Sequence, residues 1–109
     1  MEIKEERFAG KTVIHLQGSI DISASETLER SLLKLIDSGE KKLIIDFVGI
    51  SYISSSGLRV FMTAANKLSV EQGSIVLCGM NDQIKKVFEI TGFTRIFNIF
   101  PTLAEAIGA

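Results

Sequence analysis

The sequence is poor in the residues that carry disulfide, redox and metal chemistry. It has one cysteine, Cys78, so no internal disulfide can form, which is typical of proteins kept in a reducing compartment. Cys78 follows an apolar run, and this position indicates a small core residue rather than a nucleophile. His15 is the only histidine and sits in an apolar strand pattern, which favours a surface or hydrogen-bonded role over a base or ligand. We therefore expect no metal site and no cofactor.

Charge of one sign and long apolar runs are also absent. Twelve basic residues nearly balance thirteen acidic ones, so the net charge of −1 provides no attraction to nucleic acid or to an anionic membrane. No apolar run approaches the roughly 18 residues of a membrane-spanning helix. The first six residues, Met-Glu-Ile-Lys-Glu-Glu, are charged where a signal peptide needs an apolar stretch. These features predict a cytoplasmic protein without direct nucleic-acid contacts or membrane insertion.

The apolar residues that are present alternate between strand and helix spacing. Strands are predicted at residues 12–16, 43–47, 74–78 and 96–100, the last at a sheet edge. Residues 3–8 are expected to pair with 12–16 through a turn at Ala9-Gly10, forming an N-terminal hairpin.

Four helices are predicted between and after these strands. Ser23 and Glu26 have the spacing of a capping box that opens the first helix, and Gly39 is expected to end it. A second helix is marked by apolar residues from Leu58 to Leu68, a third spans residues 82–90, and a capping box at Thr102 opens the last. Phe93, Phe97 and Phe100 are expected to close the core. The order predicts one α/β domain over residues 1–109, with a mixed, mainly parallel β-sheet.

One segment could carry chemistry: the connection from Phe47 to Leu58, which we expect to be a loop at the carboxyl end of a strand. It ends in Ser54-Ser55-Ser56-Gly57 directly before a helix, whose first turn has free N–H groups and a partial positive charge. Taken alone, this pattern is typical of a helix cap and turn, and a phosphate on one of these serines would also be well placed. It is neither a P-loop nor a nucleophile elbow. Gly57 permits a close backbone turn that leaves the neighbouring hydroxyl accessible.

The segment from Asp46 to Val60, Asp-Phe-Val-Gly-Ile-Ser-Tyr-Ile-Ser-Ser-Ser-Gly-Leu-Arg-Val, resembles the signature of STAS domains of the anti-sigma factor antagonist type. The segments Gly18-Ser19-Ile20-Asp21 and Thr91-Gly92-Phe93, and the closing Ile96-Phe97, resemble the same family. The resemblance covers most of the chain and implies the STAS fold.

In that family the serine before the glycine is phosphorylated by an anti-sigma factor that is itself a serine kinase. The resemblance therefore implies phosphorylation of Ser56, with Ser55 as the second choice. It further implies that the unphosphorylated form binds the kinase and frees a sigma factor for transcription, and that a serine phosphatase resets the switch. The partner-binding residues implied are Asp21, Ser54, Ser55, Ser56, Gly57, Leu58 and Arg59. Taken without the resemblance, Asp21 is typical of a turn or cap acid.

The chain departs from the family at Ser54, where an acid is common. Arg59 is also unusual, because a cation in the first turn of a helix is electrostatically unfavourable. It is either a solvated surface residue or a contact to an acidic partner or to the phosphate. A second hypothesis is therefore a STAS subunit of a transporter or signalling complex that is not phosphorylated. A third is a nucleotide- or ligand-binding domain; the turn has no base, metal site or second phosphate-binding lysine, so we do not expect an enzyme.

Overall fold

A computed structural model describes residues 1–109, and its strands form one five-stranded sheet in the order β1-β2-β3-β4-β5. The strands are β1 (Glu2–Phe8), β2 (Lys11–Ile20), β3 (Lys42–Ile53), β4 (Ser74–Cys78) and β5 (Asn98–Phe100). β1 and β2 are antiparallel, whereas every other neighbouring pair is parallel. The predicted N-terminal hairpin, the mixed sheet and the edge position of the last strand are therefore confirmed.

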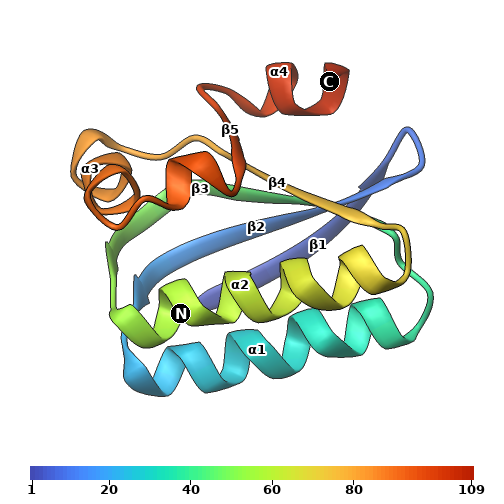
Figure 1. Cartoon of the computed structure of the whole chain (residues 1–109), viewed down its shortest axis with the longest axis horizontal. Coiled ribbons are helices and arrows are strands. Elements are labelled where there is room, and N and C mark those ends of the chain that lie inside the picture. Colours follow the sequence, from blue (N-terminus) through green and yellow to red (C-terminus); the bar gives the residue numbers. More distant parts are fainter.

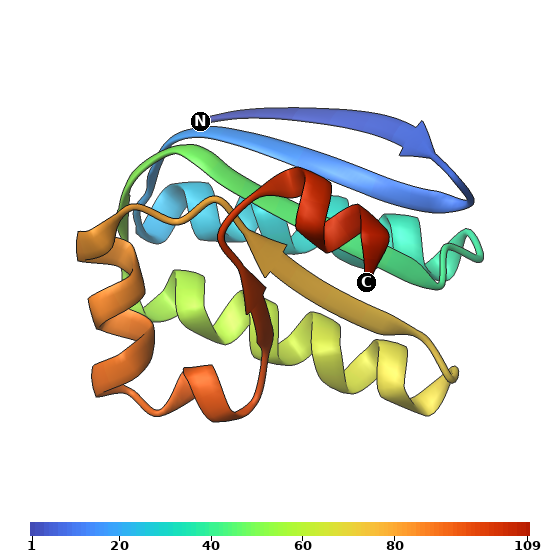
Figure 2. The same ribbon diagram turned by 90° about the horizontal axis from the view of Figure 1, so that it is seen from above.

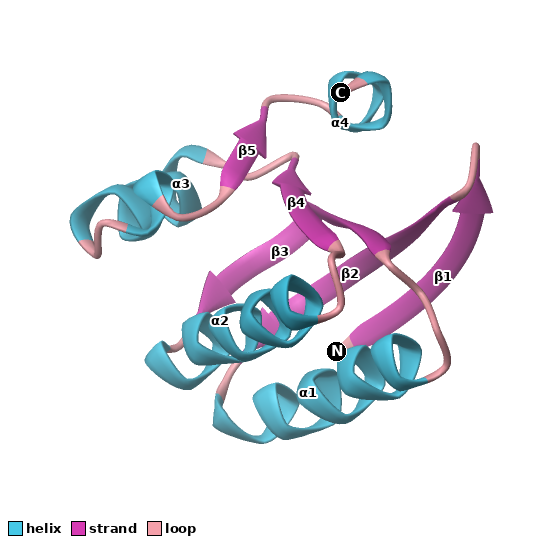
Figure 3. Ribbon diagram, turned by 45° about the vertical axis from the view of Figure 1, so that its right-hand side comes forward, coloured by secondary structure: helices cyan, strands magenta, loops and turns pink.

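The helices are α1 (Ile22–Asp37), α2 (Ser55–Val70), α3 (Asp82–Ile90) and α4 (Leu103–Gly108), and a short 3-10 turn spans Phe93–Arg95. α1 and α2 lie side by side on one face of the sheet, whereas α4 lies on the other (Figures 1 and 3). Viewed from above, α4 crosses in front of the sheet near the C-terminus (Figure 2). None of these helices is both long enough and apolar enough to cross a membrane.

Successive apolar side chains of the strands point to opposite faces of the sheet, so both faces are covered by helices at one end. Ile45 and Phe47 of β3 belong to the main core under α1 and α2, whereas Ile44 packs on the other face with Val13, Cys78 and Ala106 of α4. Because side chains point alternately to the two faces, β3 here reads as a continuous apolar run. Phe97 is buried in the main core, and Phe93 packs against it. Phe100 packs against the smaller cluster below α4.

The predicted loop from residue 48 to 57 is wrong, because β3 continues to Ile53. Its second half pairs with the second half of β2, Gly49 with Gln17 and Ile53 with Ile20, across two register shifts. This stretch has exposed residues between buried ones, so its apolar pattern is too weak to predict a strand from the sequence. It is a strand because it pairs with β2. β2 likewise extends beyond the predicted Leu16 to Ile20.

The predicted opening of α1 at Ser23 is also wrong. Asp21 is the N-cap: its carboxylate accepts the N–H of Ala24 at 2.8 Å, and Ser23 lies inside the first turn. The helix begins immediately after β2 because Ile20 is still held in the sheet opposite Ile53. The other helix boundaries agree better: Thr102 caps α4, and Gly39, with φ +105°, follows the end of α1.

Candidate functional site

The N-termini of α1 and α2 meet at the carboxyl ends of strands β2 and β3. β2 ends at Ile20 and β3 at Ile53, and these two residues are register partners. The N–H of Ser54 donates to the carbonyl of Ile20 at 2.8 Å, which holds the two strand ends together. Since each strand leads directly into a helix, the free N–H groups of two helices gather here, at the sheet edge where α/β proteins place their sites.

Ser54 caps α2. Its hydroxyl accepts the N–H of Gly57 at 3.1 Å, and the residue is only 9% exposed. Ser54 therefore fills the capping role that the family's acid could also fill. Gly57 is needed for packing: a Cβ there would lie 2.7 Å from Cγ2 of Ile20 and 2.9 Å from Cγ1 of Ile53. Gly57 was predicted to permit a close backbone turn before the helix, but it lies inside α2, and its small size is instead needed for contact between the helix and the two strand ends.

Three hydroxyls form what we call the serine cluster: Ser25, Ser54 and Ser56. The oxygen of Ser56 lies 2.9 Å from that of Ser54 and 3.0 Å from that of Ser25, and Ser25 and Ser54 are 3.4 Å apart. Ser25 also donates to the carbonyl of Asp21 at 2.7 Å. Ser56 is half-buried, whereas Ser55 is exposed and its hydroxyl makes no hydrogen bond to the cluster.

Ser25 is a member of the site that was not predicted from the sequence, although the sequence contains a signal for it. Ser25 lies on the same helical face as Leu28, Leu32 and Leu35, so a polar residue occurs where the pattern calls for an apolar one. A polar residue on a buried helix face needs a hydrogen-bond partner. Ser56 and the Asp21 carbonyl meet that need.

The predicted contact residues differ in how much of their surface is free. Asp21, Ser55 and Arg59 are exposed, whereas Gly57 and Leu58 are buried in the core. The Ala24 N–H, followed by the Ser23 hydroxyl, lowers the pKa of Asp21, so its carboxylate stays ionised. The edge therefore presents one negative charge beside a group of neutral hydroxyls.

A shallow pocket of about 500 Å³ opens between the two helix starts. Two apolar side chains flank it and are well exposed, Ile22 at 72% and Tyr52 at 54%. Neither was singled out from the sequence, because exposure of an apolar residue depends on the fold. The lining residues are Asp21, Ile22, Ser23, Tyr52, Ser54 and Ser55.

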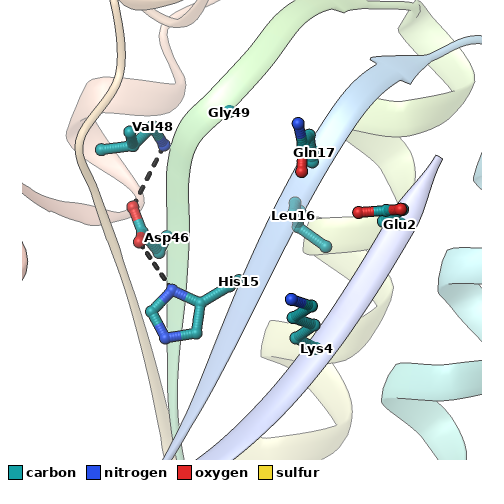
Figure 4. Close-up of a pocket in the computed structure, with 8 residues that line it drawn as sticks. All are labelled: Glu2, Lys4, His15, Leu16, Gln17, Asp46, Val48 and Gly49. Atoms are coloured by element: carbon teal, nitrogen blue, oxygen red, sulfur yellow. Dashed lines mark hydrogen bonds and ion pairs between the residues drawn. The ribbon is translucent and has the colours of Figure 1, made fainter.

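A second polar group, the histidine cluster of Glu6, His15 and Asp46, lies on the face of the sheet away from α1 and α2. Nδ1 of His15 is 2.8 Å from Asp46 and Nε2 is 3.1 Å from Glu6. The predicted hydrogen-bonded histidine is therefore confirmed. Beside it is a hollow of about 320 Å³, in which Lys4 and Gln17 come from neighbouring strands (Figure 4).

The hydrogen bond to Glu6, followed by that to Asp46, raises the pKa of His15, and partial burial opposes this. Asp46 is held in turn by the N–H of Val48 at 3.1 Å. No group of three or more His, Cys, Asp or Glu side chains has the arrangement of a metal site. Burial raises the pKa of the Cys78 thiol to about 11, so it is inert at neutral pH, as its predicted core position requires.

The family model for the STAS domain matches residues 2–106. The chain belongs to the STAS domain family. This STAS domain is 36% identical over 109 residues to BtrV of Bordetella bronchiseptica, a candidate anti-sigma factor antagonist, covering 100% of this chain and 94% of BtrV. It is 34% identical over 99 residues to the anti-sigma-B factor antagonist of Listeria monocytogenes, covering 91% of this chain and 86% of the relative.

Among solved structures, the STAS domain is similar to the Bacillus cell fate determinant SpoIIAA in its phosphorylated form. The TM-score is 0.77 at 25% identity, and the match covers 98% of this chain and 97% of SpoIIAA. The resemblance inferred from residues 46–60 is therefore confirmed at the level of family and fold.

Proposed function

We propose that this STAS domain is an anti-sigma factor antagonist whose binding is switched by phosphorylation of Ser56. Its unphosphorylated form binds an anti-sigma factor that is also a serine kinase, in the cytoplasm, and thereby frees a sigma factor for transcription. Phosphorylation by that kinase breaks the complex, and a serine phosphatase restores it. The protein acts by binding and not by catalysis.

The observation that carries this proposal is the setting of the Ser56 hydroxyl. It lies in the first turn of α2, half-buried, and contacts the hydroxyls of Ser25 and Ser54. Ser54 also lines the pocket of Asp21, Ile22 and Tyr52, so Ser56 is one hydroxyl away from that surface. Two curated relatives carry anti-sigma factor antagonist names, and SpoIIAA is described in a phosphorylated form. These similarities support phosphorylation as the switch, and the setting of the Ser56 hydroxyl supports this serine as the site.

The physics of such a switch is simple. A phosphate adds about −1.5 to −2 charges at pH 7, which exceeds the net charge of the whole chain, −1. The start of α2 tolerates this anion because its free N–H groups and dipole favour negative charge, so the fold survives. A partner docked over the Ser56 hydroxyl must instead desolvate the new charge, and the cost is about 2–7 kcal/mol for an unpaired polar group alone.

The proposed partner surface combines Asp21, Ser55 and Arg59 with the apolar rim. Asp21 supplies a fixed negative charge, and exposed Arg59 can meet an acidic group of the partner or the phosphate itself. Ile22 and Tyr52 add the apolar contact area that a stable interface needs. The buried residues Gly57 and Leu58 support partner binding indirectly, because they hold the start of α2 against the strand ends.

The deciding experiment is intact-mass analysis and phosphosite mapping of protein purified from its native host. We expect one phosphate, on Ser56, that disappears in Ser56→Ala and persists in Ser55→Ala. With the anti-sigma factor of the same host, Ser56→Asp should weaken binding by at least about tenfold. Ser55→Asp, which adds the same charge to an exposed neighbour, should weaken it less.

Two results would contradict the proposal. Phosphate mapped to a residue other than Ser56 would move the switch elsewhere. Absence of phosphate, with normal partner binding by Ser56→Asp, would favour the alternative of a STAS subunit in a larger complex that is not phosphorylated.

A further inference from the structure

The serine cluster admits one assignment of its protons in which every short contact is a hydrogen bond. A hydroxyl has one proton to donate. Ser25 gives its proton to the Asp21 carbonyl, an acceptor only, at 2.7 Å. Ser25 therefore can only accept from the other serines, and the 3.0 Å contact with Ser56 is a bond that Ser56 donates.

The rest of the chain of bonds follows. Because Ser56 has spent its proton on Ser25, the 2.9 Å contact with Ser54 is a bond that Ser54 donates. Ser54 in turn accepts the N–H of Gly57. The opposite assignment would leave two lone pairs facing each other between Ser25 and Ser56 at 3.0 Å. Only the longest contact, 3.4 Å between Ser25 and Ser54, is then without a proton.

From this geometry we propose that Ser25 is a positioning residue for the switch: it holds the Ser56 hydroxyl inward, which slows its phosphorylation. This inference rests on the proposed function of Ser56. A serine that attacks a phosphoryl group must direct a lone pair at phosphorus and release its proton to a base. In the structure that proton is instead directed at Ser25, which is 3% exposed and cannot take it to solvent.

The same arrangement connects the modification to the surface around Asp21. Once Ser56 is phosphorylated, its Oγ has no proton for Ser25. Either the phosphoserine turns outward, or Ser25 redirects its own proton from the Asp21 carbonyl to the phosphate. That carbonyl also accepts the N–H of Ser25 at 2.9 Å in the first turn of α1. Ser25 therefore joins the state of Ser56 to the residue that caps the neighbouring helix.

Removal of the Ser25 hydroxyl should accelerate labelling. One hydrogen bond of ordinary strength corresponds to a change of about 2- to 10-fold in rate. Ser25→Ala should therefore be phosphorylated about 2- to 10-fold faster than wild type. Ser25→Cys fills the same space with a weak acceptor and should also be fast. Ser25→Thr keeps a hydroxyl and should return towards the wild-type rate. Ser31→Ala, the same change six residues further along α1, should have no effect.

The experiment is an internal competition with native-host extract as the kinase source and ATP as the phosphoryl donor. Wild type and one variant are mixed in equal amounts, and intact-mass spectrometry follows both phosphorylated forms at low conversion. Their ratio reports relative kcat/KM directly. NMR measurement of the Ser56 χ1 couplings provides a readout without kinase, and Ser25→Ala should shift Ser56 towards an outward rotamer.

The outcomes separate this inference from the function on which it rests. If Ser56→Ala is labelled like wild type, the proposed function fails. If Ser56→Ala is unlabelled while Ser25→Ala is labelled at the wild-type rate or more slowly, Ser25 does not restrain Ser56 and the inference fails alone. Fast labelling of Ser25→Ala with an unchanged Ser56 rotamer would also overturn it, since the effect would then arise elsewhere.

Discussion

The serine cluster and the histidine cluster both join side chains from neighbouring elements, but the first consists of neutral groups and the second of ionisable groups. Ser25, Ser54 and Ser56 satisfy one another with neutral hydroxyls at the sheet edge. On the open face, His15 lies between the carboxylates of Glu6 and Asp46. A neutral cluster changes character when one charge is added, whereas a charged cluster responds to pH. The two regions should therefore answer to different signals.

The largest expected effect tests whether close packing positions the serine cluster. Gly57→Ala places a Cβ at 2.7 Å from Ile20 and 2.9 Å from Ile53, so the start of α2 must move away from the strand ends. We expect a loss of about 1–3 kcal/mol in the free energy of unfolding, measured by urea denaturation. Gly108→Ala is the control, because no atom lies within 4 Å of its Cβ position. Equal stability of the two variants would contradict the packing argument.

A smaller effect is expected from the cap within the serine cluster. Ser54→Ala removes the acceptor of the Gly57 N–H and the donor to Ser56, and should cost about 1 kcal/mol of unfolding free energy. Ser54→Asp, which introduces the acid common in the family, keeps a capping oxygen and should stay near wild type. Ser55→Ala should change stability by less than about 0.5 kcal/mol, because its side chain is exposed. If Ser55→Ala lowered the unfolding free energy as much as Ser54→Ala does, burial would not explain the difference between these two serines.

The sequence was sufficient for the elements whose apolar spacing is regular. The hairpin, α3 and the buried faces of α1 and α2 follow from that spacing alone, and the motif around Ser56 identified the family. The start of α1 was misplaced because Ser23 and Asp21 both suit an N-cap, and only the pairing of Ile20 with Ile53 decides between them. The predicted strand at residues 43–47 is shorter than β3, because the second half of β3 is held in the sheet by its neighbour β2.

Both clusters depend on contacts between residues distant in the chain, which spacing does not reveal. Ser25 and Ser56 are 31 positions apart, as are His15 and Asp46. The latter two meet because β2 and β3 align His15 with Asp46 in parallel register. Two bulges between these strands follow directly, so a shift of one residue in an assumed register would have separated the pair. The spacing of apolar residues does not locate these two shifts, so the pairing cannot be counted along the sequence.

The smallest effect separates the two clusters by pH. Because the pKa of His15 is raised on folding, its contribution to stability is complete below the unfolded value of 6.5 and is lost as pH rises through the folded pKa. Wild type should therefore lose up to about 1 kcal/mol relative to His15→Gln between pH 6 and 8, a modest amount since the bond to Glu6 is exposed. Denaturant titrations of both proteins across this range measure the difference. The serine hydroxyls do not titrate here, so the cost of Ser54→Ala should stay constant over the same window. A pH-dependent cost at Ser54 would show that the two regions are coupled, whereas a flat profile for His15 would contradict its raised pKa.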